Sequence, residues 1–233
     1  MRNERVLLEV IATTVADAVA AERGGADRLE LVTAMGEGGL TPSIGMIEAV
    51  VAAVSIPVNV MVRPHSRSFV YSADDFAVML RDVRALKLAG ANAAVVGMLT
   101  ASREVDRDGL QRVVDAADGM AVTFHRAFDE TRDLVEALDV LLEFDRVTNV
   151  LTSGGAGSVL DAVGEIQALV VRAGQSHCTV LAGAGLTVDR VGEFVCATRV
   201  RAVHFGSGVR VGAQGFADVD VERVRGVRRV LDC

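Results

Sequence analysis

The chain has 233 residues, 51% of them hydrophobic, and its mean hydropathy is +0.36. This composition argues against a disordered chain and suits one large core, so we expect a single domain over residues 1–233. The net charge of −7 argues against nucleic acid or an anionic membrane as partner. No apolar stretch approaches the roughly 20 residues of a membrane-spanning helix. Unpaired cysteine spacing and the lack of a recognisable signal peptide predict a cytoplasmic protein.

Short runs rich in Val, Leu and Ile alternate with segments of helical periodicity along the whole chain. We expect strands at 6–12, 28–32, 57–64, 93–99, 120–128, 147–153, 178–184 and 202–206. Continuous apolar strands are typical of a parallel sheet that helices cover. Eight of them predict a closed (β/α)8 barrel of the TIM type.

The intervening segments carry helix signals, clearest in 75–88, where apolar residues recur at spacings of three and four. Expected N-caps are Thr13 or Thr14, Ser43, Ser72 or Asp74, and Thr187, and the expected terminators are Gly24, Gly90 and Gly174. An open doubly wound sheet is the rival fold. It would place a Gly-rich turn after the first strand, whereas this chain reads IATTVADA there.

Polar residues interrupt these apolar strands, and most of them stand near a strand end. They are Glu9, Glu30, Arg63, His125, Arg126 and His204. In a (β/α)8 barrel the C-terminal strand ends build the active site, and a carboxylate such as Glu9 belongs in the lumen more than under the helices. We therefore expect these six side chains to meet at the barrel mouth.

Carboxylates, imidazoles and guanidinium groups in one mouth are suited to proton transfer on a bound anion. Glu9 or Glu30 would be the general base, His125 or His204 the acid, and the two arginines would hold the anion. The alternative is structural, because Glu9, Glu30 and Arg63 could equally form a buried salt-bridge network that stabilises the barrel.

Glycine-rich turns follow the last two strands, and they are candidates for an anion site. The predicted anion-binding residues are Ser153, Gly183, Gly185, Gly206, Ser207 and Gly208, besides the two arginines. Backbone N–H groups in such turns often bind phosphate in barrels. The alternative is that these glycines only make tight turns.

The sequence contains no metal-binding pattern such as CxxC or HxxxH, so the metal ligands remain unknown, and no organic cofactor motif is present. Cys178 and Cys196 are expected to be small buried hydrophobic residues, and Cys233 is terminal. A site for a soft metal would need thiolates or thioethers brought together in space.

Several motifs occur together in one order along the chain. They are LEVIATTVADAVAAERGGADRLELVTAMGEGGLTPSIGMI, VNVMVRP, FVYSADDFAVMLRDV, TFHRAFD, LTSGG and LAGAG. In this order they resemble the CutC family over most of the sequence. The resemblance implies a cytosolic barrel assigned to copper homeostasis, with copper(I) binding as a possible property.

One position departs from that family pattern. Some members carry a cysteine after Glu-Leu at the end of the second strand, where this chain has Val32. Valine cannot bind copper, so that ligand is not carried over. Three interpretations follow: a copper-handling protein, an isomerase or lyase acting on a small anionic or phosphorylated metabolite, and a barrel scaffold. The expected partner is a copper ion or a small anion, and a homo-oligomer, guessed as a dimer, is expected.

Overall fold

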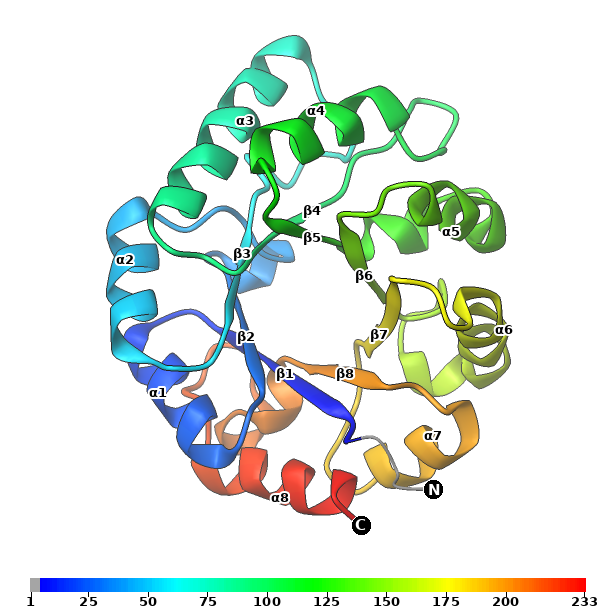
Figure 1. The fold of residues 1–233 in the computed structure, drawn as a ribbon. Helices are drawn as coiled ribbons and strands as arrows, with labels where there is room; N and C mark the ends of the chain where they lie inside the picture. Colours follow the sequence, from blue (N-terminus) through cyan, green and yellow to red (C-terminus); the bar gives the residue numbers. More distant parts are fainter. Residues whose placement is uncertain (1–4) are drawn as a thin grey trace.

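The computed structural model describes residues 5–233 as a closed barrel of eight parallel strands in chain order. Figure 1 looks along the barrel, with the strands forming a ring inside a layer of helices. The strands are β1 (Leu7–Ala12), β2 (Arg28–Leu31), β3 (Val58–Met61), β4 (Ala93–Val96), β5 (Ala121–Phe124), β6 (Val147–Thr152), β7 (Thr179–Gly183) and β8 (Ala202–Phe205). The predicted (β/α)8 barrel is thereby confirmed.

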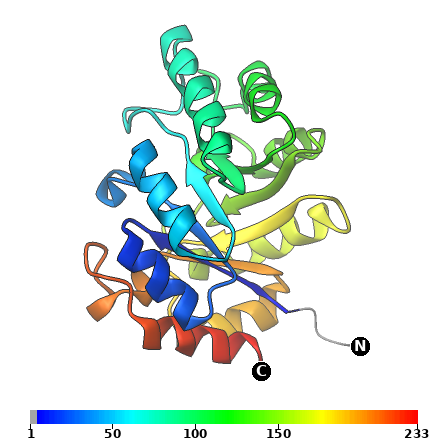
Figure 2. The ribbon, with the colours of Figure 1, turned by 60° about the vertical axis from the view of Figure 1, so that its left-hand side comes forward.

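One α-helix follows each strand and covers the outside of the barrel. These are α1 (Val15–Gly24), α2 (Ile44–Ala53), α3 (Ala73–Leu88), α4 (Arg107–Ala117), α5 (Leu134–Leu142), α6 (Val163–Ala173), α7 (Val191–Thr198) and α8 (Val221–Leu231). Helix α8 packs beside α1, so the last unit closes on the first (Figure 2). None of the helices between residues 5 and 233 is long and apolar enough to cross a membrane.

Strand alternation divides the barrel residues into two layers. Leu8, Val10, Leu29 and Leu31 are fully buried in the main core, while the residues between them point into the lumen, as successive side chains in a strand do. A separate small cluster of Leu7, Leu151, Leu181 and Ala202 fills part of the lumen. The lumen is therefore packed, and Glu9 and Glu30 lie within it.

Barrel closure places β1 beside both β2 and β8. Glu9 is in register with Arg28 on β2 and with His204 on β8. Arg28 and Glu30 are two residues apart on the same strand, so they share the lumen face. Residues separated by almost the whole chain length thus meet at one level of the barrel.

Most of the expected helix signals are confirmed. Thr14, Ser43 and Ser72 cap their helices through side-chain hydrogen bonds, and Ser72 forms a capping box with Asp75. Gly90 has a positive φ of 84° after α3, and Gly174 has one of 53° after α6.

Several local predictions were wrong. The third and fourth strands end at Met61 and Val96, three residues earlier than predicted. The fifth strand ends at Phe124 and not at Phe128, because a 3-10 helix (η2) begins at Arg126, with the His125 ring capping it. The left-handed residue after α1 is Gly25, at φ 97°, while Gly24 belongs to the helix and packs closely on Val224. Thr187 does not cap α7, which begins at Val191. Cys196 is exposed.

Candidate active site

A cavity of about 440 Å³ opens at the C-terminal end of the barrel. That size lies in the range of small-molecule sites. Its polar lining includes Glu30, Arg63, His125, Arg126 and His204, five of the six side chains predicted to meet there. Apolar side chains form the remaining wall, among them Ile11, Val32, Met35, Met61, Leu151 and Leu186.

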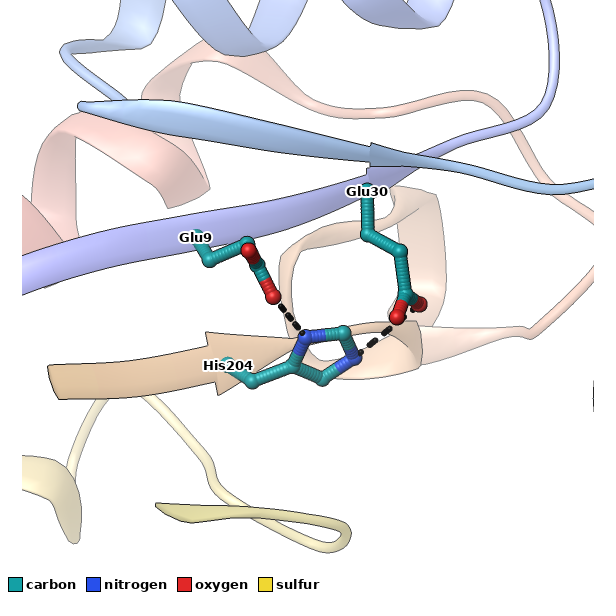
Figure 3. Close-up of side chains that lie close together, drawn as sticks. All are labelled: Glu9, Glu30 and His204. Atoms are coloured by element: carbon teal, nitrogen blue, oxygen red, sulfur yellow. Dashed lines mark hydrogen bonds and ion pairs between the residues drawn. The ribbon is translucent and has the colours of Figure 1, made fainter. Parts of the chain in front are cut away.

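Glu9, His204 and Glu30 form a row with His204 in the middle (Figure 3), and of these three His204 and Glu30 line the cavity. The Nδ1 of His204 lies 2.8 Å from Oε1 of Glu9, and its Nε2 lies 3.8 Å from Oε2 of Glu30. The other oxygen of Glu9 accepts from Nε of Arg28 at 2.5 Å and from the Asn59 amide at 3.3 Å. Glu9 lies below the cavity lining, so it reaches the cavity only through His204.

The two carboxyl groups have opposite pKa shifts although both are buried. Burial alone would raise the pKa of Glu9, but Arg28 and His204 outweigh it and lower that pKa to about 2. For Glu30, burial raises the pKa to about 7; the charge of His204 partly offsets this, and the charge of Glu9 adds to it. Glu9 is therefore a fixed anion, whereas Glu30 exchanges a proton near neutral pH.

His204 lies between these two carboxyl groups. Burial would lower its pKa, but the neighbouring Glu30 and Glu9 outweigh burial and raise it. Because ionised Glu9 can only accept, the imidazole donates its Nδ1–H to that carboxylate. This bond holds the ring with its Nε2 toward Glu30.

Arg63 and His125 also line the cavity, and both contact the ring of Phe69. The guanidinium carbon of Arg63 lies 4.7 Å from the centre of the Phe69 ring, and the His125 ring centre lies 5.1 Å from it. Nη1 of Arg63 donates to the carbonyl oxygens of Glu37 and Gly39, while its buried Nε has no partner. Within residues 5–233, no carboxylate lies at ion-pair distance from this arginine.

His125 presents a neutral ring. Its Nδ1 accepts from the backbone N–H of Ala127 at 3.1 Å, which places the ring hydrogen on Nε2. Burial, together with the nearby charge of Arg63, lowers the His125 pKa to about 3. The buried Nε2 has no partner in the described chain. Gly97 makes room for the ring, because a Cβ there would lie 2.4 Å from two ring atoms.

Arg126 lies at the rim with its side chain 45% exposed. Its Nε donates to Asp129 at 2.8 Å and its Nη2 to the hydroxyl of Ser153 at 3.0 Å. Ser153 is fully buried, lies 2.9 Å from Oδ2 of Asp129, and is not among the described residues that line the cavity. The three residues thus tie the loop after β6 to the start of η2.

The Gly-rich turns are closely packed against protein atoms. A Cβ on Gly185 would meet the Ser158 hydroxyl at 2.3 Å, and one on Gly208 would meet the Leu186 carbonyl at 2.4 Å. A Cβ on Gly206 would lie 3.1 Å from Ile11 and from Met35. Gly183 lies outside the described cavity lining and leaves space for His204. Packing therefore accounts for these glycines, and the phosphate role of the turns, including Ser207, stays a prediction.

Sequence reasoning missed Arg28, Asn59 and Asp129. Arg28 stands two residues before Glu30 on the same strand, so alternation alone could have placed it in the lumen. Asn59 has the same signal inside β3. Asp129 lies within the FHRAFD motif, but its contacts depend on η2, which replaces the predicted end of the strand.

The same residues can be tested for their fit to copper. Ligand atoms of Glu9, Glu30 and His204 lie within 4.8 Å of one another. These are nitrogen and oxygen donors, which suit copper(I) less well than sulfur does. The guanidinium of Arg28 already neutralises Glu9 and would repel a cation. None of the three cysteines lines the described cavity, but Met35 and Met61 do.

Fold and site together define a (β/α)8 barrel protein with a charged, ligand-sized cavity at the C-terminal strand ends. The CutC family model matches residues 6–209. The family protein CutC of Caulobacter vibrioides is 41% identical over 227 residues, covering 93% of this chain and 91% of the relative. The human relative, named copper homeostasis protein cutC homolog, is 42% identical over 78% of this chain and 66% of its own length. The chain belongs to the CutC family.

Solved structures agree with this assignment. CutC from Streptococcus agalactiae superposes with a TM-score of 0.81 at 27% identity, covering 85% of this chain and 97% of that one. A phosphoribosylanthranilate isomerase from Thermotoga maritima superposes with a TM-score of 0.65 at 14% identity over 97% of this chain and 98% of that one. The second likeness concerns the fold alone.

Proposed function

We propose that this protein is an enzyme that transfers a proton on a small anionic metabolite bound in the mouth cavity. The observation that carries the proposal is Glu30: a buried carboxyl group that lines the cavity, has one oxygen without a partner, and has a pKa near 7. A general base works best when its pKa is close to the working pH. Isomerase or lyase chemistry fits such a base.

The neighbouring residues support the roles of base and positioning group. His204 contacts both carboxyl groups, and Glu9 holds it in place while Arg28 and Asn59 hold Glu9. Glu9 and His204 thus act on the substrate through Glu30, in the proposed arrangement. The unpaired charge of Arg63 favours an anionic substrate, and Arg126 at the rim can add a second contact.

Hydrogen exchange in heavy water tests this proposal on a whole mixture of candidate substrates. The protein is incubated with a metabolite extract in D2O, and NMR identifies compounds that lose a C–H signal. We expect exchange with the wild type and with Glu48→Gln, which changes an exposed carboxyl group, but not with Glu30→Gln. Exchange that persists in Glu30→Gln would contradict the assignment of the base.

A second candidate function is copper(I) binding, in line with the name of the human relative. Met35 and Met61 favour it, because both line the cavity and pack in one apolar cluster with Val32. Thioethers are soft ligands that suit copper(I). Copper(I) affinity is measured by competition with a chromophoric chelator. We expect the double variant Met35→Leu, Met61→Leu to bind copper(I) more weakly than a variant in which serine replaces the three cysteines. Equal copper affinity in both variants would exclude the two thioethers.

The location and the assembly of the protein also remain predictions. Cell fractionation tests the cytoplasmic location. Light scattering of the purified protein tests whether it forms a homo-oligomer. A cytoplasmic dimer is the expected result, and a monomer at working concentration would exclude the dimer.

A further inference from the structure

Three buried polar atoms without a protein partner belong to residues that line one cavity. They are Oε1 of Glu30, Nε of Arg63 and Nε2 of His125. An unpartnered buried polar atom is costly in a protein interior. Its presence is explained when a ligand supplies the missing partner. The three atoms therefore predict features of the ligand. It should carry a proton or a donor for the Glu30 oxygen, and one acceptor for each of the N–H groups of Arg63 and His125.

The two donors differ in kind. Arg63 carries a permanent positive charge; its Nη1 donates to two carbonyl groups and its side-chain neighbour Tyr71 is neutral, so its charge is left to attract an anion in the cavity. A guanidinium edge matches a carboxylate in charge and in geometry. His125 is neutral and offers one N–H, which suits an uncharged carbonyl oxygen.

Arg63 and His125 line the same cavity and both contact the ring of Phe69, and the charge of Arg63 acts on the His125 ring. A small ligand that contacts both residues carries an anionic group and a carbonyl oxygen within one short molecule. A 2-oxo acid has this arrangement, with a carboxylate bonded directly to the carbonyl carbon. The apolar wall of Ile11, Val32 and Met61 lies beside the carbon chain of such a ligand.

We propose that Arg63 and His125 form a binding site for the 2-oxo carboxylate unit of a small 2-oxo acid. The role of Glu30 in this proposal rests on the proposed function, whereas the substrate class is argued from Arg63 and His125. Arg63 binds the carboxylate, and His125 donates its Nε2–H to the 2-oxo oxygen. Glu30 is left to face the carbon next to the carbonyl.

The chemical step balances without an oxidant or a further reactant. Glu30 takes a proton from C3, the C–H electron pair forms the C2–C3 double bond, and the carbonyl π electrons move onto the 2-oxo oxygen. The N–H of His125 stabilises the resulting enolate oxygen, as donors in an oxyanion site do. Return of the proton from Glu30 to C3 restores the 2-oxo acid, and in D2O the returned atom is deuterium.

Binding of 2-oxobutyrate tests the substrate class, with butyrate and inorganic phosphate as comparison probes. We expect the full chain to bind 2-oxobutyrate at least about tenfold more tightly than butyrate, because a site built for a hydrogen bond rejects the analogue that lacks it. His125→Leu should abolish this preference, whereas Arg63→Gln should weaken the binding of both acids. Equal affinity for the two acids, or binding of phosphate alone, overturns the inference.

Folding of the variants is checked by circular dichroism and thermal unfolding. If Arg63→Gln does not fold, His125→Leu still decides, since leucine keeps an apolar side chain against Phe69 and Phe124 and the recorded side-chain hydrogen bond that it loses is the one from the Ala127 N–H. Glu30→Gln separates the two proposals: it should bind 2-oxobutyrate but not exchange the C3 hydrogens. If the wild type binds 2-oxobutyrate but does not exchange its C3 hydrogens, the binding site is supported and the assignment of Glu30 as the base is contradicted. If the wild type exchanges hydrogens of other metabolites but does not bind 2-oxobutyrate, the assignment of the base is supported and the 2-oxo acid site is contradicted.

Discussion

Two carboxyl groups in this barrel are equally buried and yet differ in their partners and in their pKa. Asp17 and Glu30 are both 2% exposed. Asp17 accepts hydrogen bonds from Thr13, from the Val219 backbone and from Arg210. Burial would raise its pKa, but these contacts outweigh burial and lower it. Glu30 keeps one oxygen without a partner, and its pKa is raised to about 7.

The difference separates a structural charge from a functional one. Asp17 ties α1 and β1 to the segment after β8, since Arg210 also donates to the carbonyl oxygens of Ile11 and Ala217. Both carboxylate oxygens of Asp17 thus serve the fold. Glu30 has one recorded ion-pair contact, with His204, and it lines the cavity, where we propose that a ligand uses it. Substitutions at the two positions should therefore have opposite consequences for stability and activity.

Asp17→Asn should destabilise the protein by about 3–5 kcal/mol, because it leaves Arg210 buried without its partner. Glu30→Gln should leave the unfolding free energy at pH 8 unchanged or higher. Chemical denaturation of both variants at that pH measures the difference. If Glu30→Gln were as destabilising as Asp17→Asn, Glu30 would be a structural residue too.

The stability of wild type and Glu30→Gln should diverge with pH. A carboxyl group with a raised pKa stabilises the folded state below its unfolded value of about 4.5, and this contribution is lost as pH rises through about 7. We therefore expect the unfolding free energy of Glu30→Gln, relative to that of the wild type, to rise by about 3 kcal/mol between pH 4.5 and pH 7. Denaturation at a series of pH values gives the difference directly, and a constant difference would refute the raised pKa.

Replacing His204 should shift the pH dependence of the proton-transfer rate. The charge of His204 lowers the pKa of Glu30 and so opposes burial. In His204→Gln the rising limb of the rate profile should move to higher pH, while the rate at the plateau falls by a smaller factor than in Glu30→Gln. An unmoved profile would show that His204 does not act on Glu30.

Gly97→Ala should affect ligand binding less than replacement of His125 does, since it moves the ring without removing it. The new Cβ overlaps the imidazole ring, and overpacking of this kind costs about 1–3 kcal/mol. Gly164→Ala in α6 is the matched control, because nothing lies within 4 Å of its Cβ position, and it should stabilise by about 0.5–1 kcal/mol. Thermal unfolding and 2-oxobutyrate binding measure both variants; unaltered binding in Gly97→Ala would separate this glycine from the site.

Strand alternation and strand count were enough to predict the barrel, the lumen position of Glu9 and the meeting of five polar side chains at the mouth. Alternation could have placed Arg28 in the lumen, but it could not predict Arg28 as the partner of Glu9, because that pairing depends on the register between β1 and β2. Nor could it show that Ser153 turns toward Asp129, since η2 and the loop after β6 determine that contact.

The difference between Asp17 and Glu30 was also beyond sequence reasoning. Asp17 resembles a first-turn helix residue near Thr14, and its partner Arg210 is 193 positions away. Which buried atoms lack a partner depends on the final side-chain arrangement. For that reason the sequence could name Glu30 and His125 as candidates but could not rank Glu9 below Glu30 as the base.

Titration of the Glu30 carboxyl carbon by NMR tests the central claim most directly. Protein labelled with carbon-13 at the glutamate carboxyl groups is followed across the pH range, and the signal missing in Glu30→Gln identifies this residue. We predict a midpoint at about pH 7 for Glu30, with Glu9 still ionised far below it. A Glu30 midpoint at or below its ordinary value of about 4.5 would contradict its role as a base poised near neutral pH.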